Sequence, residues 1–319
     1  MKDNPKVSRE TVSRLEGSGL QIGYGDHVIV DEMDVDIRSD RITTIIGPNG
    51  SGKSTVLKAI TRLIRYQQGS VLLNGQDILD MKPKELARTI GVLPQVHSAP
   101  ADFRVKELVS YGRMPHQKLL SGLSGEDESI IRWAMEATGT WQFRDKSIFE
   151  ISGGERQRVW IATVLAQKPE ILFLDEPTTY LDISHQLETM QLVKKLNRET
   201  GIGVVMVLHD LAQALEVSDH IIVIKNGRKY SEGAPEEVIT PKMMMDVYKR
   251  LDLFKTLRGQ WCLGSDEMMQ FCGKENYTTL ISAPFVSKTQ RAAHLPVMGE
   301  KGMDLLLELK EEFLDRFED

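Results

Sequence analysis

The glycine-rich segment Gly47–Thr55 has residue types and a spacing that suit phosphate binding. Its sequence, GPNGSGKST, fits the pattern G-x4-G-K-[ST]. The glycines allow the backbone to curl so that successive N–H groups point at phosphate oxygens, and the N-terminus of a following helix adds partial positive charge. We expect Lys53 to reach the β- and γ-phosphates of a nucleotide and the Ser54 hydroxyl to bind Mg²⁺. The predicted phosphate-binding residues are Gly47, Pro48, Asn49, Gly50, Ser51, Gly52, Lys53, Ser54 and Thr55.

Two adjacent acids, Asp175 and Glu176, follow the apolar run 171–174. A buried strand seldom ends in two carboxylates unless a cation lies nearby. Downstream of a phosphate-binding loop, this pattern predicts that Asp175 holds Mg²⁺. Glu176 projects in another direction and can orient or deprotonate an attacking water. Together the two motifs predict ATP hydrolysis with Mg²⁺ as the cofactor.

These side chains need a scaffold in which strands and helices alternate, and the sequence predicts one. Apolar runs predict strands at 43–46, 91–94, 171–175, 204–209 and 221–225. Helical spacing predicts helices at 55–64, 84–88, 156–167, 184–199 and 211–217. This alternation indicates an α/β fold whose core is a mostly parallel sheet covered on both faces.

Other segments depart from this alternation. Residues 20–37 and 70–79 alternate and carry turn residues, which predicts antiparallel strands. Residues 105–150 have helical spacing without strong strand signals and are expected to form a helical insertion. We expect residues 1–17 to be flexible. The segment 249–319 is a C-terminal extension, in which an amphipathic helix is predicted at 305–317.

Composition and charge narrow the class of protein. Hydrophobic residues make up 41% and charged residues 27%, as in globular proteins, and the net charge of -6 gives no support for a nucleic-acid binder. No run approaches the roughly 20 apolar residues of a spanning helix, and the N-terminus lacks a signal-peptide pattern. We therefore expect a cytosolic protein that reaches a membrane only through a partner. Cys262 and Cys272 match no zinc spacing and are expected to be free thiols.

Between the two motifs, the segment Ile151–Arg158 (ISGGERQR) resembles the LSGGQ signature of ABC ATPases. It departs from that pattern at two positions, with isoleucine first and glutamate fifth. Ser152, Gly153 and Gly154, which would contact nucleotide, are intact. These three residues precede a helix, so their hydroxyl and backbone donors would lie at its positive end, suited to a γ-phosphate.

Other elements of ABC ATPases follow in the family's order, over about residues 18–248. Tyr24 resembles the aromatic residue that stacks on adenine, and Gln95 resembles the Q-loop glutamine, which would contribute to metal binding and catalysis. Asp182 resembles the D-loop aspartate, and His209, at the end of a predicted strand, resembles the switch histidine. Taken singly, these residues could be a turn tyrosine, a surface amide, a helix N-cap and a helix-cap histidine. Their joint order favours the family.

The resemblance implies a P-loop NTPase of the ABC type, with a mostly parallel core sheet, a small antiparallel β subdomain and a helical subdomain at about 96–165. It also implies a head-to-tail homodimer, in which the signature of one subunit completes the ATP site of the other. Glu176, His209 and Gln95 would then act in hydrolysis, and Ser54, Gln95 and Asp175 would hold the metal.

Two further stretches resemble the ATPases of iron–siderophore, haem and cobalamin importers. They are Val109–His116 (VSYGRMPH) and Thr178–Gln186 (TTYLDISHQ). This resemblance implies the motor subunit of an importer, with ferric siderophores as the leading cargo. Its partners would be an integral membrane permease, which docks near 96–125, and indirectly an extracytoplasmic substrate-binding protein. The subunit would lie on the cytoplasmic side of the cell membrane. Two alternatives stay open: import of haem, cobalamin or a metal ion, and a soluble ABC-type regulator whose extension is an interaction module.

Overall fold

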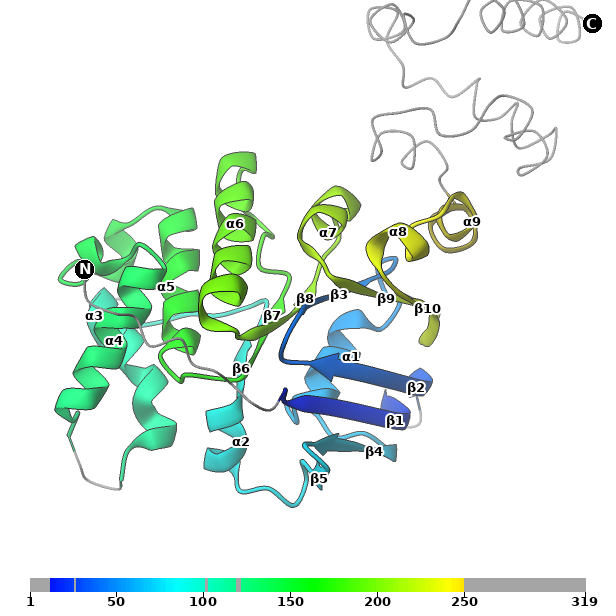
Figure 1. The fold of residues 1–319 in the computed structure, drawn as a ribbon, viewed down its shortest axis with the longest axis horizontal. Coiled ribbons are helices and arrows are strands. Elements are labelled where there is room, and N and C mark those ends of the chain that lie inside the picture. Colours follow the sequence, from blue (N-terminus) through cyan, green and yellow to red (C-terminus); the bar gives the residue numbers. More distant parts are fainter. Residues whose placement is uncertain (1–11, 26, 101–102, 119–121, 250–319) are drawn as a thin grey trace, which may run out of the picture. The chain divides into compact units, whose positions relative to one another are not determined.

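A mostly parallel six-stranded sheet forms the centre of the structure, a computed structural model that describes residues 12–25, 27–100, 103–118 and 122–249 (Figure 1). The strand order is β10-β9-β3-β8-β7-β6. All neighbours in it pair in parallel except β9 and β10, which are antiparallel. The strands are β3 (Ile42–Ile46), β6 (Ile90–Leu93), β7 (Ile171–Asp175), β8 (Gly203–Val207), β9 (His220–Lys225) and β10 (Arg228–Gly233). The predicted α/β class is therefore confirmed.

Helices cover both faces of this sheet. Helix α1 lies on one side and contacts β7 and β8, while α6 contacts β8 and α7 contacts β3 (Figure 1). The helices near the sheet are α1 (Lys53–Ile60), α2 (Pro83–Thr89), α6 (Ile183–Thr200), α7 (Leu211–Val217), α8 (Pro235–Val238) and α9 (Pro241–Met243). Helix α1 ends four residues before the predicted limit because Arg62 adopts a left-handed conformation, with a φ of 60°.

A second, antiparallel sheet has the strand order β2-β1-β4-β5. Its strands are β1 (Arg14–Tyr24), β2 (His27–Arg38), β4 (Gln68–Leu73) and β5 (Gln76–Asp77). Asn74 and Gly75 both have positive φ, as the tight turn between β4 and β5 requires. Strand β1 begins at Arg14, so the expected flexible segment 1–17 is too long. The reason is that Leu15 is fully buried and Arg14–Gly17 pair with β2.

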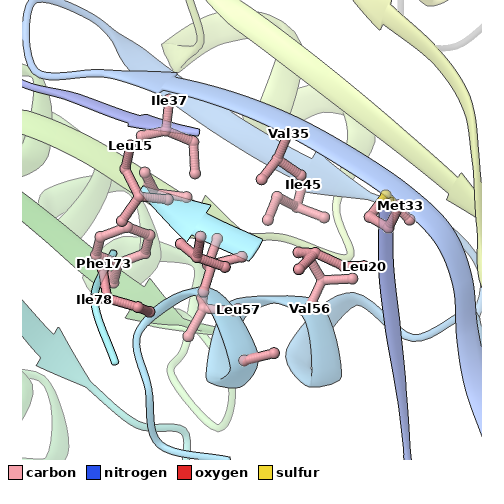
Figure 2. Packing of buried hydrophobic residues seen from close by; sticks show 14 of the residues in the cluster. Leu15, Leu20, Met33, Val35, Ile37, Ile45, Val56, Leu57, Ile78 and Phe173 are labelled. Carbon is pink, nitrogen blue, oxygen red and sulfur yellow. The ribbon is translucent and has the colours of Figure 1, made fainter. Parts of the chain in front are cut away.

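A hydrophobic cluster fills the space between the two sheets. Val56 and Leu57 of α1 meet Leu20 and Met33 of the antiparallel sheet and Phe173 of β7, all with no exposed surface (Figure 2). Burying each such side chain contributes about 1.5 to 3 kcal/mol. This packing fixes α1 beneath the parallel sheet, and with it the residues at the N-terminus of α1.

The predicted insertion at 105–150 is helical. It contains α3 (Val105–Ser110), η1 (Tyr111–His116), α4 (Gly125–Ala137), η2 (Trp141–Phe143) and η3 (Ile148–Glu150). Of these, α3, η1 and α4 pack with α5 (Gly153–Leu165), and η2 packs with α3 and α4. Arg113 of η1 forms a buried ion pair with Asp127 of α4 and also binds a carbonyl at the end of α5. Arg113 Nε donates to Asp127 Oδ1 at 2.8 Å, and Arg113 Nη1 donates to the Ala166 carbonyl at 2.7 Å. The pair and its hydrogen bonds hold the pKa of Asp127 down at about 2.

Strand β8 ends at Val207. His209 was predicted to be the last residue of this strand, but it lies two residues after the strand ends.

The chain divides into two compact units, 1–243 and 244–319, and in the second the structure describes a π-helical turn, Met244–Tyr248. The predicted helix at 305–317, Cys262 and Cys272 lie outside the described residues. Within the described ranges, no helix combines the length and apolar character needed to cross a bilayer.

We expect Asp127→Asn to lower the free energy of unfolding at pH 7 by about 2 to 4 kcal/mol, because it leaves Arg113 buried without its partner. The folded-state pKa of Asp127 lies below the unfolded value, so this stabilisation is present above pH of about 4 and is lost as the pH falls through about 2. Denaturant unfolding at pH 7 and pH 3 measures both effects. The control is Asp145→Asn, since Asp145 is 73% exposed. Equal stability losses for the two variants would contradict the prediction.

Candidate functional site

The predicted chemical residues lie on loops that leave the carboxyl ends of four parallel strands. Gly47 follows β3, Gln95 lies beyond β6, Glu176 follows β7 and His209 lies beyond β8. These four strands are consecutive in the sheet, in the order β3-β8-β7-β6. Because parallel strands point the same way, their carboxyl ends share one edge, where ligands of open α/β sheets bind. The fold thus gathers residues that are far apart in the sequence.

The phosphate-binding loop between β3 and α1 needs glycine at two positions for different reasons. Gly47 has a φ of 154°, and a Cβ there would lie 2.1 Å from the Ile224 carbonyl oxygen of β9. Gly52 has a φ of 101°, and a Cβ there would lie 2.8 Å from Val30. Gly50, with a φ of 75°, faces open space. The loop therefore curls tightly against the sheet while one side of it stays open.

Lys53, the first residue of α1, lies inside the curl of this loop. Its ammonium donates to the carbonyl oxygens of Gly47 and Pro48 at 2.9 and 3.0 Å, and the residue is only 5% exposed. Burial lowers its pKa, while the nearby carboxylates of Glu176 and Asp175 oppose that change. The loop thus holds a cation that an anionic ligand can approach from the open side.

Asp175 and Ser54 form a pair with unused capacity to bind a cation. The Ser54 hydroxyl donates to Asp175 Oδ1 at 2.8 Å, while Asp175 Oδ2 is buried with no hydrogen-bond partner. Burial raises the pKa of Asp175, and the hydrogen bond from Ser54 opposes this. The described residues include no group of three or more His, Cys, Asp or Glu side chains that could hold a metal ion. The pair suits Mg²⁺, which takes one or two protein oxygens and completes its shell with phosphate and water.

Glu176 is held by residues from three loops. His209 Nε2 donates to its Oε1, Gln95 Nε2 donates to its Oε2 at 2.7 Å, and Thr179 Oγ1 donates to Oε2 at 3.0 Å. Glu176 also has a φ of 54°, a costly conformation for a residue other than glycine. The structure thus brings together Glu176, Gln95 and His209, the three residues predicted to act in hydrolysis. Sequence reasoning missed Thr179, which only its position three residues after Glu176 could have indicated.

The signature residues begin helix α5 and form a reciprocal cap. Glu155 N–H donates to Ser152 Oγ at 3.2 Å, and Ser152 N–H donates to Glu155 Oε2 at 2.8 Å. These bonds lower the pKa of Glu155. Either glutamate or glutamine at the third helical position can complete such a cap. The glutamate that departs from the family pattern therefore preserves the geometry of this helix start.

The two signature glycines have different surroundings. Gly153 is exposed, and a Cβ there would meet nothing within 4 Å. Gly154 is buried, and a Cβ there would overlap the ring of His185 on α6. The atoms nearest to that Cβ position thus belong to His185 of α6. Ser152 and Gly153 are left facing outward.

Two predicted residues lie apart from this cluster. Tyr24 ends β1 and is 57% exposed, so adenine stacking on it stays a prediction. Asp182 is the N-cap of α6, where its Oδ1 accepts from the His185 N–H at 2.9 Å. The N-cap interpretation weighed for Asp182 is therefore correct. Its side chain remains 69% exposed, so its outer surface stays accessible.

Comparisons with known proteins agree with this geometry. The family model described as ABC transporter matches residues 30–179. The chain is 48% identical over 238 residues to the iron(3+)-hydroxamate import ATP-binding protein FhuC of Bacillus subtilis, covering 75% of this chain and 88% of the relative. It is 45% identical over 239 residues to the ferric enterobactin transport ATP-binding protein FepC of Escherichia coli, with the same two coverages, 75% and 88%.

A solved structure gives the same result for the fold. A dimeric ATP-binding cassette in a post-hydrolysis state, bound to ADP and Pi, matches with a TM-score of 0.60 and 29% identity, over 69% of this chain and 98% of the other. The glycine-rich loop, the acidic strand end, the capped signature and these likenesses lead to one conclusion: the chain belongs to the ATP-binding proteins of ABC transporters.

Proposed function

We propose that the chain hydrolyses ATP as the motor subunit of an ABC importer for ferric siderophores. The observation that carries the ATPase part is the position of Glu176, held by Gln95, Thr179 and His209 at the sheet edge where Asp175 meets Ser54. A carboxylate oriented by several donors beside a phosphate-binding loop suits the activation of a water molecule. The names of the two curated relatives support the choice of cargo.

In this proposal the chain first binds ATP and then hydrolyses it. The N–H groups of the loop residues 49–53 cradle the phosphates, and Lys53 exchanges its contacts with the Gly47 and Pro48 carbonyls for the β- and γ-phosphates. Tyr24 stacks on the adenine. Ser54, Asp175 and Gln95 would hold Mg²⁺, which when bound neutralises charge on the phosphate oxygens. The buried free oxygen of Asp175 supports this assignment.

Glu176 then orients the attacking water and takes its proton, and His209 and Gln95 position it. Both neighbours contact Glu176 in this structure, so each can transfer its hydrogen bond to water or phosphate when ATP is bound. Thr179 donates to Oε2, the same carboxylate oxygen that Gln95 binds, and limits rotation of the carboxylate. The left-handed backbone conformation at Glu176 fixes the direction in which its side chain leaves the main chain.

Each ATP site is completed by a second copy of the chain. Ser152 and Gly153 face outward at the positive end of α5, where they can donate to the γ-phosphate held by a partner subunit. The matched cassette bound to ADP and Pi is a dimer, which supports this arrangement. Asp182, exposed at the start of α6, would lie at the same interface.

The membrane partners follow from the importer proposal. The subunit binds a permease on the cytoplasmic side of the membrane, and the permease receives cargo from an extracytoplasmic substrate-binding protein. Tyr111 and Met114 of η1 are 44% and 56% exposed, which is large for apolar side chains and suits contact with a permease. They lie in the stretch 109–116 that resembles importer ATPases.

We expect Glu176→Gln to reduce ATP turnover by about 10²- to 10⁴-fold while ATP binding is retained, because the amide keeps the shape but cannot accept the water's proton. Phosphate release and equilibrium binding of a fluorescent ATP analogue measure the two properties. Glu199→Gln, at an exposed position on α6, is the matched control. Turnover of Glu176→Gln near the wild-type rate would show that the assigned base is wrong.

We expect Asp175→Asn to raise the Mg²⁺ concentration needed for half-maximal ATP hydrolysis by at least about tenfold, since the variant loses the charged oxygen beside Ser54. The thermal stabilisation that ATP gives in Mg²⁺ should shrink toward its value in EDTA. Asp80→Asn, at an exposed position, should leave both measurements unchanged. The metal assignment fails if Asp175→Asn keeps the wild-type Mg²⁺ dependence.

The transport proposal predicts that the tagged chain co-purifies from solubilised membranes with a polytopic membrane protein. Loss of the chain should abolish uptake of iron delivered as a ferric siderophore and leave uptake of haem and cobalamin unchanged. Radiolabelled uptake in cells with and without the gene, restored by the wild type but not by Glu176→Gln, provides the measurement. Loss of haem or cobalamin uptake instead would identify another cargo. Absence of any membrane partner would favour a soluble regulator.

A further inference from the structure

The imidazole of His185 occupies the space where a side chain on Gly154 would lie. A Cβ built on Gly154 would be 1.5 Å from His185 Cδ2 and 2.3 Å from Cγ, far inside any permitted contact. Gly154 is the second residue of α5, and His185 is the third residue of α6. The ring therefore touches the signature backbone directly, between the cap residue Ser152 and the body of α5.

The contact depends on the shape of the ring more than on its polar atoms. His185 Nδ1 is buried and makes no hydrogen bond within the described structure. The nearest acceptor, Asp182 Oδ1, lies 3.4 Å away and already accepts from the His185 backbone N–H. A buried polar atom without a partner is costly, so the ring is kept there by its fit against Gly154.

Helix α6 is in turn tied to the loops that hold Glu176. Gln213 of α7 donates to Gln186 Oε1 at 2.8 Å, and Thr178 donates to Gln213 Oε1 at 3.3 Å. Gln186 also donates to the Leu181 carbonyl at 2.9 Å. Because Thr178 lies two residues after Glu176, α6 cannot shift at its N-terminus without moving groups near the assigned base.

A second link joins α5 and α6 one turn further along. Arg158 Nη1 donates to Glu188 Oε2 at 2.5 Å. Arg158 is four residues after Gly154, and Glu188 is three residues after His185, so the two contacts lie on the same pair of helix faces. The ion pair and the His185 ring thus both bridge α5 and α6, the ring at the first turn of α5.

We propose that His185 is a positioning residue for the signature: its ring holds Gly154, and thereby Ser152 and Gly153, at a fixed place relative to α6. This inference rests on the proposed function, in which Ser152 and Gly153 contact the ATP bound by the partner subunit. Movement of the Glu176 loop would reach the signature of the same chain through α7, α6 and His185. The ring thus links one ATP site of the dimer to the other.

The first test compares His185→Ala with His185→Phe in the full-length chain. We expect His185→Ala to lower kcat for ATP by about 10- to 100-fold, because small displacements of groups that contact the reacting phosphate are costly. Binding of ATP to the monomer should change less than about twofold, since the phosphate-binding loop is intact. His185→Phe retains the ring and should keep kcat within about threefold of wild type. Lys195→Ala, an exposed change on the same helix, should have no effect.

The second test creates a steric conflict between a side chain at position 154 and the His185 ring, and then removes it by removing the ring. Gly154→Ala alone should lower both the melting temperature and kcat, because its Cβ overlaps the His185 ring. In a His185→Ala background the methyl group has room, so adding Gly154→Ala should cost less, or should restore part of the lost activity. A double-mutant cycle on kcat and melting temperature measures this coupling. Additive effects of the two changes would overturn the proposal.

The outcomes separate this inference from the proposed function. A wild-type chain that fails to hydrolyse ATP, alone or with its permease, would contradict the proposed function itself. Wild-type hydrolysis together with an unchanged kcat in His185→Ala would contradict only the role of His185. A loss of kcat in both His185→Ala and His185→Phe would also overturn it, because shape alone would not then explain the effect.

Discussion

The hydrogen bond from Ser54 to Asp175 joins the N-terminus of α1 to the carboxyl end of β7, and the site depends on it. Its length is set by packing at a distance, since Val56 and Leu57 of α1 are buried against both sheets. If α1 were displaced, Lys53 would leave the curl of the phosphate-binding loop, and Asp175 would lose the hydrogen bond that opposes its raised pKa. The hydrophobic core therefore holds the charged groups of the site in register.

The parts of the site that lie within one short segment could be predicted from the sequence. The loop Gly47–Thr55 and the pair Asp175–Glu176 each carry their chemistry in consecutive residues, and the strands before them, β3 and β7, are fully buried and mostly apolar. The alternation of parallel strands and helices along the chain could be predicted in the same way. Strand β10 was missed because its sequence, RKYSEG, has no apolar alternation. It forms by pairing with β9 across the turn Asn226–Gly227, which is a tertiary effect.

Residues that act through side-chain contacts over long separations could not be predicted. His185 is recognisable only when α5 and α6 are placed side by side, because nothing in its local sequence indicates Gly154 as its neighbour. Thr179 is close to Glu176 in the sequence, but its contact also needs the left-handed backbone at Glu176, which the sequence does not reveal. Glu155 is different: the pattern S-x-x-E at residues 152–155 is a capping signal that the sequence does contain.

The stretch 109–116 resembles importer ATPases and also binds the end of α5. Arg113 and His116 resemble residues of importer ATPases, yet both are turned inward and bind the end of α5. Arg113 donates to the Ala166 carbonyl, and His116 Nε2 donates to the Gln167 carbonyl at 2.8 Å, where burial lowers the histidine's pKa.

Helix α5 is therefore fixed at both ends, by Ser152 and Glu155 at its start and by Arg113 and His116 at its end. A helix held at both ends in this way moves as a rigid body. Tyr111 and Met114 are exposed on the same short segment as Arg113, so a permease bound there, as in the importer we propose, would press on that end of α5. Because the signature is at the opposite end of α5, a displacement at residues 111–116 would be carried along the helix to Ser152. This connection gives a physical route by which the state of a permease could control ATP hydrolysis.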